Sequence, residues 1–66
     1  MTKIEAIAAM RNEEKVTHTY FSDNEWMQLL STGDYEFEDG CVVDPALFWS
    51  DRKGLDWEDG WEIFSN

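Results

Sequence analysis

The residues best suited to chemistry in this 66-residue sequence are its carboxylates. Fifteen aspartates and glutamates stand against five lysines and arginines, which gives a formal net charge of -10 at pH 7. A carboxylate pair can perform general acid–base catalysis when one member is desolvated and the two pKa values separate. With acids this dense, close pairs arise by chance, and no sequence feature selects one pair for such a role.

The sequence contains no complete motif for binding a metal or for a catalytic nucleophile. Residues 34–40, DYEFEDG, have the acids of a calcium loop but lack its D-x-[DN]-x-[DN]-G order. Cys41 has no second cysteine, and His18, the single histidine, has no second ligand or nucleophile nearby. We interpret Cys41 as a small core residue and His18 as a sheet residue. The chain is therefore predicted to be no enzyme and to need no cofactor or metal.

Large aromatic residues are interleaved with acids in three places, residues 35–39, 48–51 and 56–62. Buried rings anchor protein interfaces, while the surrounding carboxylates steer a basic partner and can occupy sites built for phosphates. The plain alternative is that the rings form the core and the acids are its solvated face. The predicted partner-binding residues are Glu36, Glu38, Asp39, Trp49, Asp56, Trp57, Glu58 and Asp59.

The negative charge is concentrated in the second half of the chain. Residues 31–66 contain ten acids and two bases, a balance of -8, whereas residues 1–30 contain five acids and three bases, a balance of -2. Such a field repels nucleic acid and anionic membranes and attracts basic protein surfaces. No apolar run approaches the roughly 20 residues that span a bilayer, and a lone cysteine fits a reducing cytoplasm. We expect a basic protein partner, no nucleic acid, no membrane and a cytoplasmic location.

Local signals predict the elements of the first half. A T-x-x-E capping box at the start predicts a helix over residues 3–11. Residues 15–21, rich in β-branched and aromatic side chains, predict a strand with Tyr20 on one face and Phe21 on the other. Residues 25–30 form a second strand or, alternatively, a short helix. With a turn between them, the two strands would make a hairpin.

The second half contains the clearest turn and helix signals. Asp39-Gly40 predicts a type I′ hairpin turn, in which both residues have positive φ, followed by a return strand. Asp44-Pro45 predicts the start of a short helix that ends at Gly54. On that helix Phe48 and Trp49 lie about 100° apart, so one ring is expected to be partly exposed. Residues 61–64 alternate like a closing strand.

These elements predict one α+β domain over residues 1–66. An N-terminal helix and a second short helix would pack on a small antiparallel sheet. A single core of this size supports only a marginal monomer, because little apolar surface is available to offset the loss of chain entropy. A second copy could stabilise it, so a homodimer is an alternative state.

The two ends of the chain, IEAIAAMRNEEKVTHTYF and WEDGWEIF, resemble small tailed-phage proteins of host takeover and anti-defence. The layout is similar to that of Thoeris anti-defence 2, a family whose members oligomerise and sequester signalling nucleotides. The resemblance covers about the first 20 and the last 8 residues and implies the host cytoplasm. Together with the acidic charge it predicts an inhibitor that occludes a basic nucleic-acid-binding surface of a host defence or DNA-processing protein. The alternatives are a signalling-nucleotide sponge and a structural or assembly protein of a phage.

Overall fold

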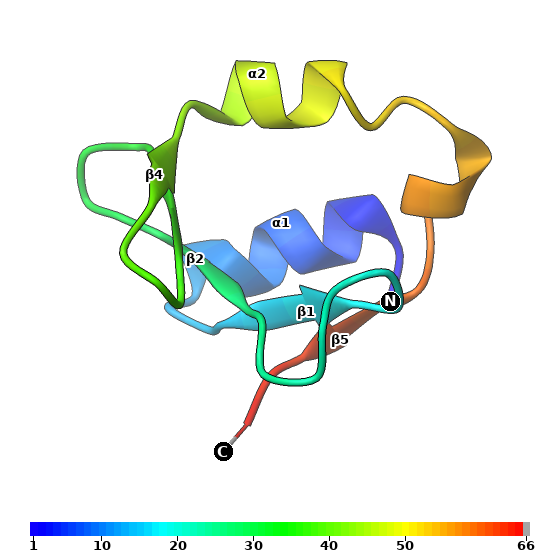
Figure 1. The fold of residues 1–66 in the computed structure, drawn as a ribbon, viewed down its shortest axis with the longest axis horizontal. Helices are drawn as coiled ribbons and strands as arrows, with labels where there is room; N and C mark the ends of the chain where they lie inside the picture. Colours follow the sequence, from blue (N-terminus) through cyan, green and yellow to red (C-terminus); the bar gives the residue numbers. More distant parts are fainter. Residues whose placement is uncertain (66) are drawn as a thin grey trace.

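A computed structural model describes residues 1–65 of the chain (Figure 1). The strands form one antiparallel sheet in the order β4-β3-β2-β1-β5, and both helices contribute to one core with it. The predicted α+β class is therefore confirmed. The elements in chain order are α1 (Lys3–Arg11), β1 (Val16–His18), β2 (Met27–Leu29), β3 (Tyr35–Phe37), β4 (Val42–Val43), α2 (Pro45–Ser50), the 3-10 helix η1 (Leu55–Trp57) and β5 (Trp61–Ile63).

Helix α1 begins and ends at the predicted residues. The Thr2 hydroxyl accepts a hydrogen bond from the Glu5 N–H at 3.2 Å, and the Glu5 carboxylate accepts one from the Thr2 N–H at 2.8 Å. This reciprocal capping box satisfies two N–H groups that the helix itself cannot pair. Ala6 and Met10, one turn apart, are buried against the sheet. Asn12 caps the last turn.

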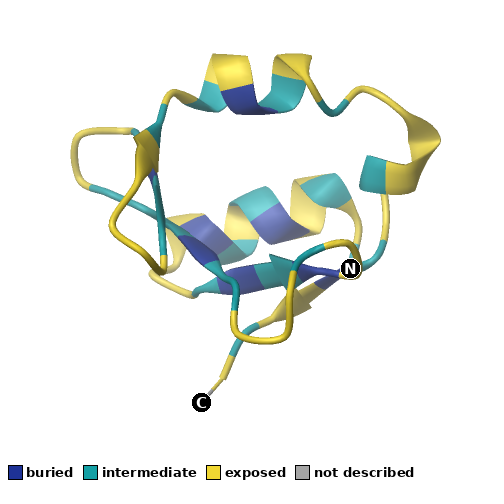
Figure 2. Ribbon diagram, in the orientation of Figure 1, coloured by how far each residue is buried: buried dark blue, intermediate teal, exposed yellow. Residues whose placement is uncertain are grey.

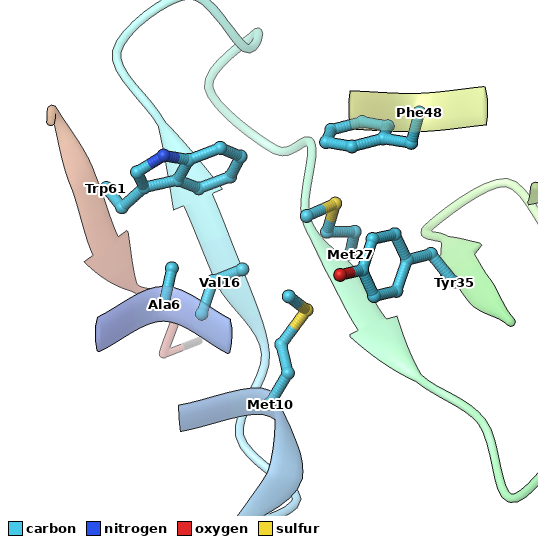
Figure 3. Close-up of a cluster of buried hydrophobic side chains, with 7 residues drawn as sticks. All are labelled: Ala6, Met10, Val16, Met27, Tyr35, Phe48 and Trp61. Carbon is cyan, nitrogen blue, oxygen red and sulfur yellow. The ribbon is translucent and has the colours of Figure 1, made fainter. Parts of the chain in front are cut away.

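The core lies between the sheet and the two helices, which pack on the same sheet face. Strand residues that point to this face meet side chains from α1 and α2. Figure 2 marks the buried segments of both helices and of the strands in dark blue. Among residues 1–65, no helix packs on the opposite sheet face. The buried hydrophobic side chains are Ala6, Met10, Val16, Met27, Tyr35, Phe48 and Trp61 (Figure 3).

The β3–β4 hairpin is at the predicted place but has a different turn. The Phe37 carbonyl accepts from the Gly40 N–H at 2.9 Å, and the Phe37 N–H donates to the Cys41 carbonyl at 2.8 Å. Gly40 has φ +88°, whereas Asp39 does not have positive φ, so the type I′ prediction is wrong. The turn is a three-residue loop that ends in a left-handed glycine. Asp39 favours it by accepting the Cys41 N–H at 3.0 Å.

Two further predictions about this half of the chain are corrected. Cys41 is exposed rather than part of the core, because it follows the left-handed glycine at the tip of the hairpin. Helix α2 ends at Ser50 and does not extend to Gly54. The Arg52 side chain instead returns to the helix and donates to the Phe48 carbonyl at 3.1 Å, which satisfies a free carbonyl of the last turn.

The strands of the first half are shorter than predicted. β1 ends at His18, where the Phe21 N–H donates to the His18 carbonyl at 2.9 Å and closes a turn. This turn leaves Tyr20 59% exposed and brings the Phe21 ring back to the core side, 5.7 Å from Trp61. Residues 27–29 form a strand, so the alternative short helix is excluded.

The core predicts a sharp difference between two neighbours on α2. Phe48 is 1% exposed and Leu47 is 64% exposed. Phe48→Ala should lower the free energy of unfolding by about 3–5 kcal/mol, because the burial of the ring is lost and a cavity is left in the core. Leu47→Ala should change the free energy of unfolding by under about 0.5 kcal/mol. Urea unfolding followed by tryptophan fluorescence measures both. Similar losses in the two variants would contradict this packing of α2.

Candidate interaction surface at one end of the sheet

Three acidic segments meet at one end of the sheet because of the strand directions. β1 and β3 are both antiparallel to β2 and so run the same way, and β5 runs opposite to β1. The ends of β1 and β3 and the starts of β2 and β5 therefore share one end, across which β3 and β5 lie about 14 Å apart at the usual strand spacing. We call this the acidic end, defined by Asp23, Glu25, Glu38, Asp39, Asp56, Glu58 and Asp59.

Five of the eight predicted partner-binding residues lie at the acidic end and are exposed: Glu38, Asp39, Asp56, Glu58 and Asp59. Glu36 lies in β3 on the helix-free face, half-buried, and its carboxylate accepts from the Gln28 side-chain amide at 2.9 Å. Its neighbours Tyr35 and Phe37 point to the core, as strand alternation predicts for the residues on either side of an outward-facing Glu36. Glu36 therefore lies within the strand and is paired with Gln28, whereas the five other acids lie outside the strands, at the acidic end.

The two predicted ring anchors are packing residues rather than free side chains. Trp49 is half-buried, lies 5.5 Å from Trp61, and donates its indole N–H to the Tyr35 hydroxyl at 2.9 Å. Trp57 is also half-buried and stacks on the His18 ring at 4.3 Å. Of the pair Phe48 and Trp49, the partly exposed ring is thus Trp49, and its indole N–H is already paired.

His18 attaches the segment between η1 and β5 to the sheet. Its ring is 4% exposed, with Nε2 at 2.7 Å from the Asp59 carbonyl and 3.1 Å from the Asp56 carbonyl. Nδ1 accepts from the Tyr20 N–H at 3.0 Å, so the ring proton belongs on Nε2, which donates to the carbonyls. Both ring nitrogens are occupied by backbone groups. His18 therefore has a positioning role and no free nitrogen for a metal or a substrate.

Gly60 is required where this segment meets β1. It has φ +88°, and a Cβ there would lie 3.0 Å from the Thr19 hydroxyl and 3.1 Å from His18 Nε2. Only glycine combines the left-handed backbone with so close an approach. Because Asp59 directly precedes Gly60, this fit also fixes where the Asp59 backbone lies.

Tyr20 is an exposed ring at the acidic end, and it is not among the eight partner-binding residues predicted from the sequence. It lies edge-on to Trp57 with the ring centroids 5.3 Å apart. The Asp56 carboxylate beside it raises the pKa of the Tyr20 phenol, because phenolate next to a carboxylate is repelled. The phenol therefore stays a neutral hydrogen-bond donor. The strand-like composition of residues 15–21 concealed the turn that exposes this ring.

A shallow hollow lies beside these groups. Its volume is about 220 Å³, and two carboxylates of different segments contribute to its lining. A space of this size accommodates one long side chain rather than a nucleotide, since ligand pockets are typically about 300–1,000 Å³. The lining residues are Thr17, His18, Thr19, Phe21, Ser22, Asp23 and Glu62.

The role of His18 can be tested by removing its ring nitrogens. His18→Phe keeps a stacking ring but leaves two carbonyls and one N–H without partners, so it should lower the free energy of unfolding by about 2–4 kcal/mol. Thr19→Val is the matched control. It removes the exposed 3.2 Å hydrogen bond from the Thr19 hydroxyl to the Gly60 carbonyl, which joins the same two segments. It should lose under about 1 kcal/mol in urea unfolding. Equal losses would show that the His18 bonds are dispensable.

A second prediction concerns the β3–β4 turn. The Asp39 carboxylate accepts the Cys41 thiol at 3.4 Å and raises the pKa of that thiol, while the Cys41 N–H lowers the pKa of Asp39. The thiolate is the reactive form, so Asp39→Asn should lower the thiol pKa and speed alkylation by iodoacetamide at pH 8. Asp59→Asn makes the same charge change elsewhere and should leave the rate nearly unchanged. A rate unaffected by Asp39→Asn would refute the coupling.

Comparisons with known proteins assign no function to this surface. No family model, no curated protein and no solved structure matches the chain. Within residues 1–65 no helix is long and apolar enough to cross a membrane. Over the same residues, no group of three or more histidine, cysteine, aspartate or glutamate side chains is arranged to hold a metal ion.

Proposed function

We propose that the chain is a stoichiometric inhibitor that occludes a basic nucleic-acid-binding surface of a host defence or DNA-processing protein. The observation that carries the proposal is the gathering of carboxylates from three separate segments at one end of the sheet. Carboxylates spaced over a rigid surface can replace the phosphates that such a basic surface normally binds. The inhibitor acts by occupation, without catalysis or a cofactor.

The acidic end supports this mechanism because hydrogen bonds fix its backbone. His18 fixes the backbone at Asp56 and Asp59, and Asp39 fixes the β3–β4 turn. The carboxylates are then presented without a large loss of entropy on binding. The hollow lined by Asp23 and Glu62 fits one lysine or arginine side chain of the partner. Tyr20 adds an exposed ring of the type that anchors interfaces.

The signalling-nucleotide sponge is less well supported by the monomer. Two hollows on the described residues have volumes of about 170 and 220 Å³. Both are below the roughly 300–1,000 Å³ of typical ligand pockets. An anionic nucleotide would also approach a domain of charge -10. A sponge would therefore need a nucleotide site formed between copies of the chain, as in a homodimer.

We place the proposed inhibitor in the cytoplasm of a phage-infected host because the chain ends resemble phage anti-defence proteins. We expect a protein partner with a basic surface, and no binding to nucleic acid or membranes, because both carry the same sign of charge as the domain. The partner is to be captured from a bacterial lysate on the immobilised chain and identified by mass spectrometry. DNA should compete with the chain for binding to that partner.

Two matched double variants test whether the acidic end makes the contact. Glu38→Gln with Glu58→Gln neutralises two exposed acids of the acidic end, and Glu13→Gln with Glu14→Gln neutralises two exposed acids at the other end. Both carry a net charge of -8. The first should slow association with the captured partner about 3- to 10-fold in stopped flow, and the second by under about twofold.

Salt should weaken binding as well, because the Debye length falls from about 14 Å at 0.05 M to about 4 Å at 0.5 M. Circular dichroism establishes that both variants keep the fold. Equal effects of the two double variants, or an affinity that does not change with salt, would reject mimicry through the acidic end.

A further inference from the structure

A second hollow opens at the end of the sheet opposite the acidic end. Its volume is about 170 Å³, and it lies between the last turn of α1, the β2–β3 turn and the start of α2. Strand directions place it away from the proposed interface, because β2 ends and β3 begins there. The lining residues are Ile7, Met10, Arg11, Leu29, Gly33, Tyr35 and Pro45.

The walls of this hollow are apolar and its floor is the core. Met10 and Tyr35 are 2% and 4% exposed, and Figure 3 shows both among the core side chains. Ile7 and Leu29 are half-buried walls. On the turn side a Cβ added at Gly33 would meet nothing within 4 Å, so the space is open there. A cavity of about 150 Å³ binds benzene, so this one can hold a single ring or a branched aliphatic group.

Arg11 is the charged side chain of the lining. It is exposed and, within residues 1–65, forms no ion pair within 4.0 Å. The acids next to the lining in sequence have other partners: Asp34 accepts the Thr32 hydroxyl at 3.2 Å, and Asp44 accepts the Leu47 N–H at 3.3 Å. The planar guanidinium is thus free to bind a carboxylate with two parallel hydrogen bonds.

We infer that this hollow binds an apolar monocarboxylate, with the apolar group between Ile7, Leu29 and Tyr35 and the carboxylate on Arg11. Because the domain carries -10, every additional negative charge on a ligand is repelled. The site therefore favours one carboxylate over a phosphate or a nucleotide. The ligand is a free small acid or the carboxyl end of a peptide whose last residue is apolar. This inference does not depend on the proposed inhibitor function.

Benzoate is the probe, with benzamide as the neutral ligand of the same shape. Titration of the intact chain, followed by backbone amide resonances, should give saturable shifts at Ile7 and Gly33 with benzoate. Benzamide should bind about fivefold or more weakly, because it lacks the charge that strengthens the bond to arginine.

Arg11→Gln should weaken benzoate binding about fivefold or more, whereas Lys53→Gln should change it by less than about twofold. Both variants remove one exposed positive charge, and Lys53 does not line the hollow, so the pair separates a direct contact from the overall field. Circular dichroism checks that each variant is folded.

A tetrapeptide ending in phenylalanine, with a free or an amidated carboxyl end, distinguishes the two sources. Tighter binding of the free-acid peptide than of benzoate assigns the site to chain ends, and the reverse order assigns it to small acids. Three results would overturn the inference: no saturable shift up to about 20 mM benzoate, a range that covers weak millimolar affinities; equal affinity for benzamide; or equal effects of Arg11→Gln and Lys53→Gln.

Discussion

The hydrogen bonds from the buried His18 ring to the Asp56 and Asp59 carbonyls are the interactions on which the acidic end depends. They join β1 to a segment about forty residues further along the chain with a neutral donor and neutral acceptors. Salt does not screen such bonds as it screens exposed ion pairs. In the described residues the one ion pair within 4.0 Å joins the N-terminal amine to Asp59 at 3.7 Å. Apart from Asp59, the carboxylates of this end thus form no ion pair within residues 1–65.

The few cations of the chain lie mostly over aromatic rings. Lys3 lies 4.5 Å from the Trp49 ring centroid, Lys15 lies 4.3 Å from that of Trp26, and Arg52 lies 4.0 Å from that of Phe48. Three of the five basic side chains thus shield the faces of rings that a small core covers incompletely. This arrangement stabilises an aromatic-rich domain, and it also leaves the fifteen acids with little local compensation. The cations keep their charge over the rings, so the net charge of -10 is set by the sequence and not by this arrangement.

Local signals predicted what local interactions determine. The capping box fixed the start of α1 and Asn12 capped its end, and alternation correctly placed Tyr35 and Phe37 inward. Long-range pairing determined the rest. The sequence does not state that β5 pairs with β1, yet this pairing brings the acids before β5 to the same end as the β3–β4 turn. The exposure of Tyr20 and Cys41 follows from turn geometry that composition does not encode. The half-burial of Trp49 and Trp57 depends on partners, Tyr35 and His18, that are distant in sequence.

The helix-free face of the sheet is not uniformly polar. Thr17 lies opposite Glu62, whereas Glu36 lies between Gln28, to which it is hydrogen-bonded, and the 54% exposed Val42. By strand alternation Trp26, next to the core residue Met27, points to this face, and its half-buried ring lies 6.4 Å from that of Phe64. Large rings of this kind are where interface energy concentrates. Groups suited to recognition also occur at the two sheet ends, where turns expose Tyr20 at one and leave the Arg11 hollow at the other. Turn geometry and strand alternation together therefore decide where this domain can recognise another molecule.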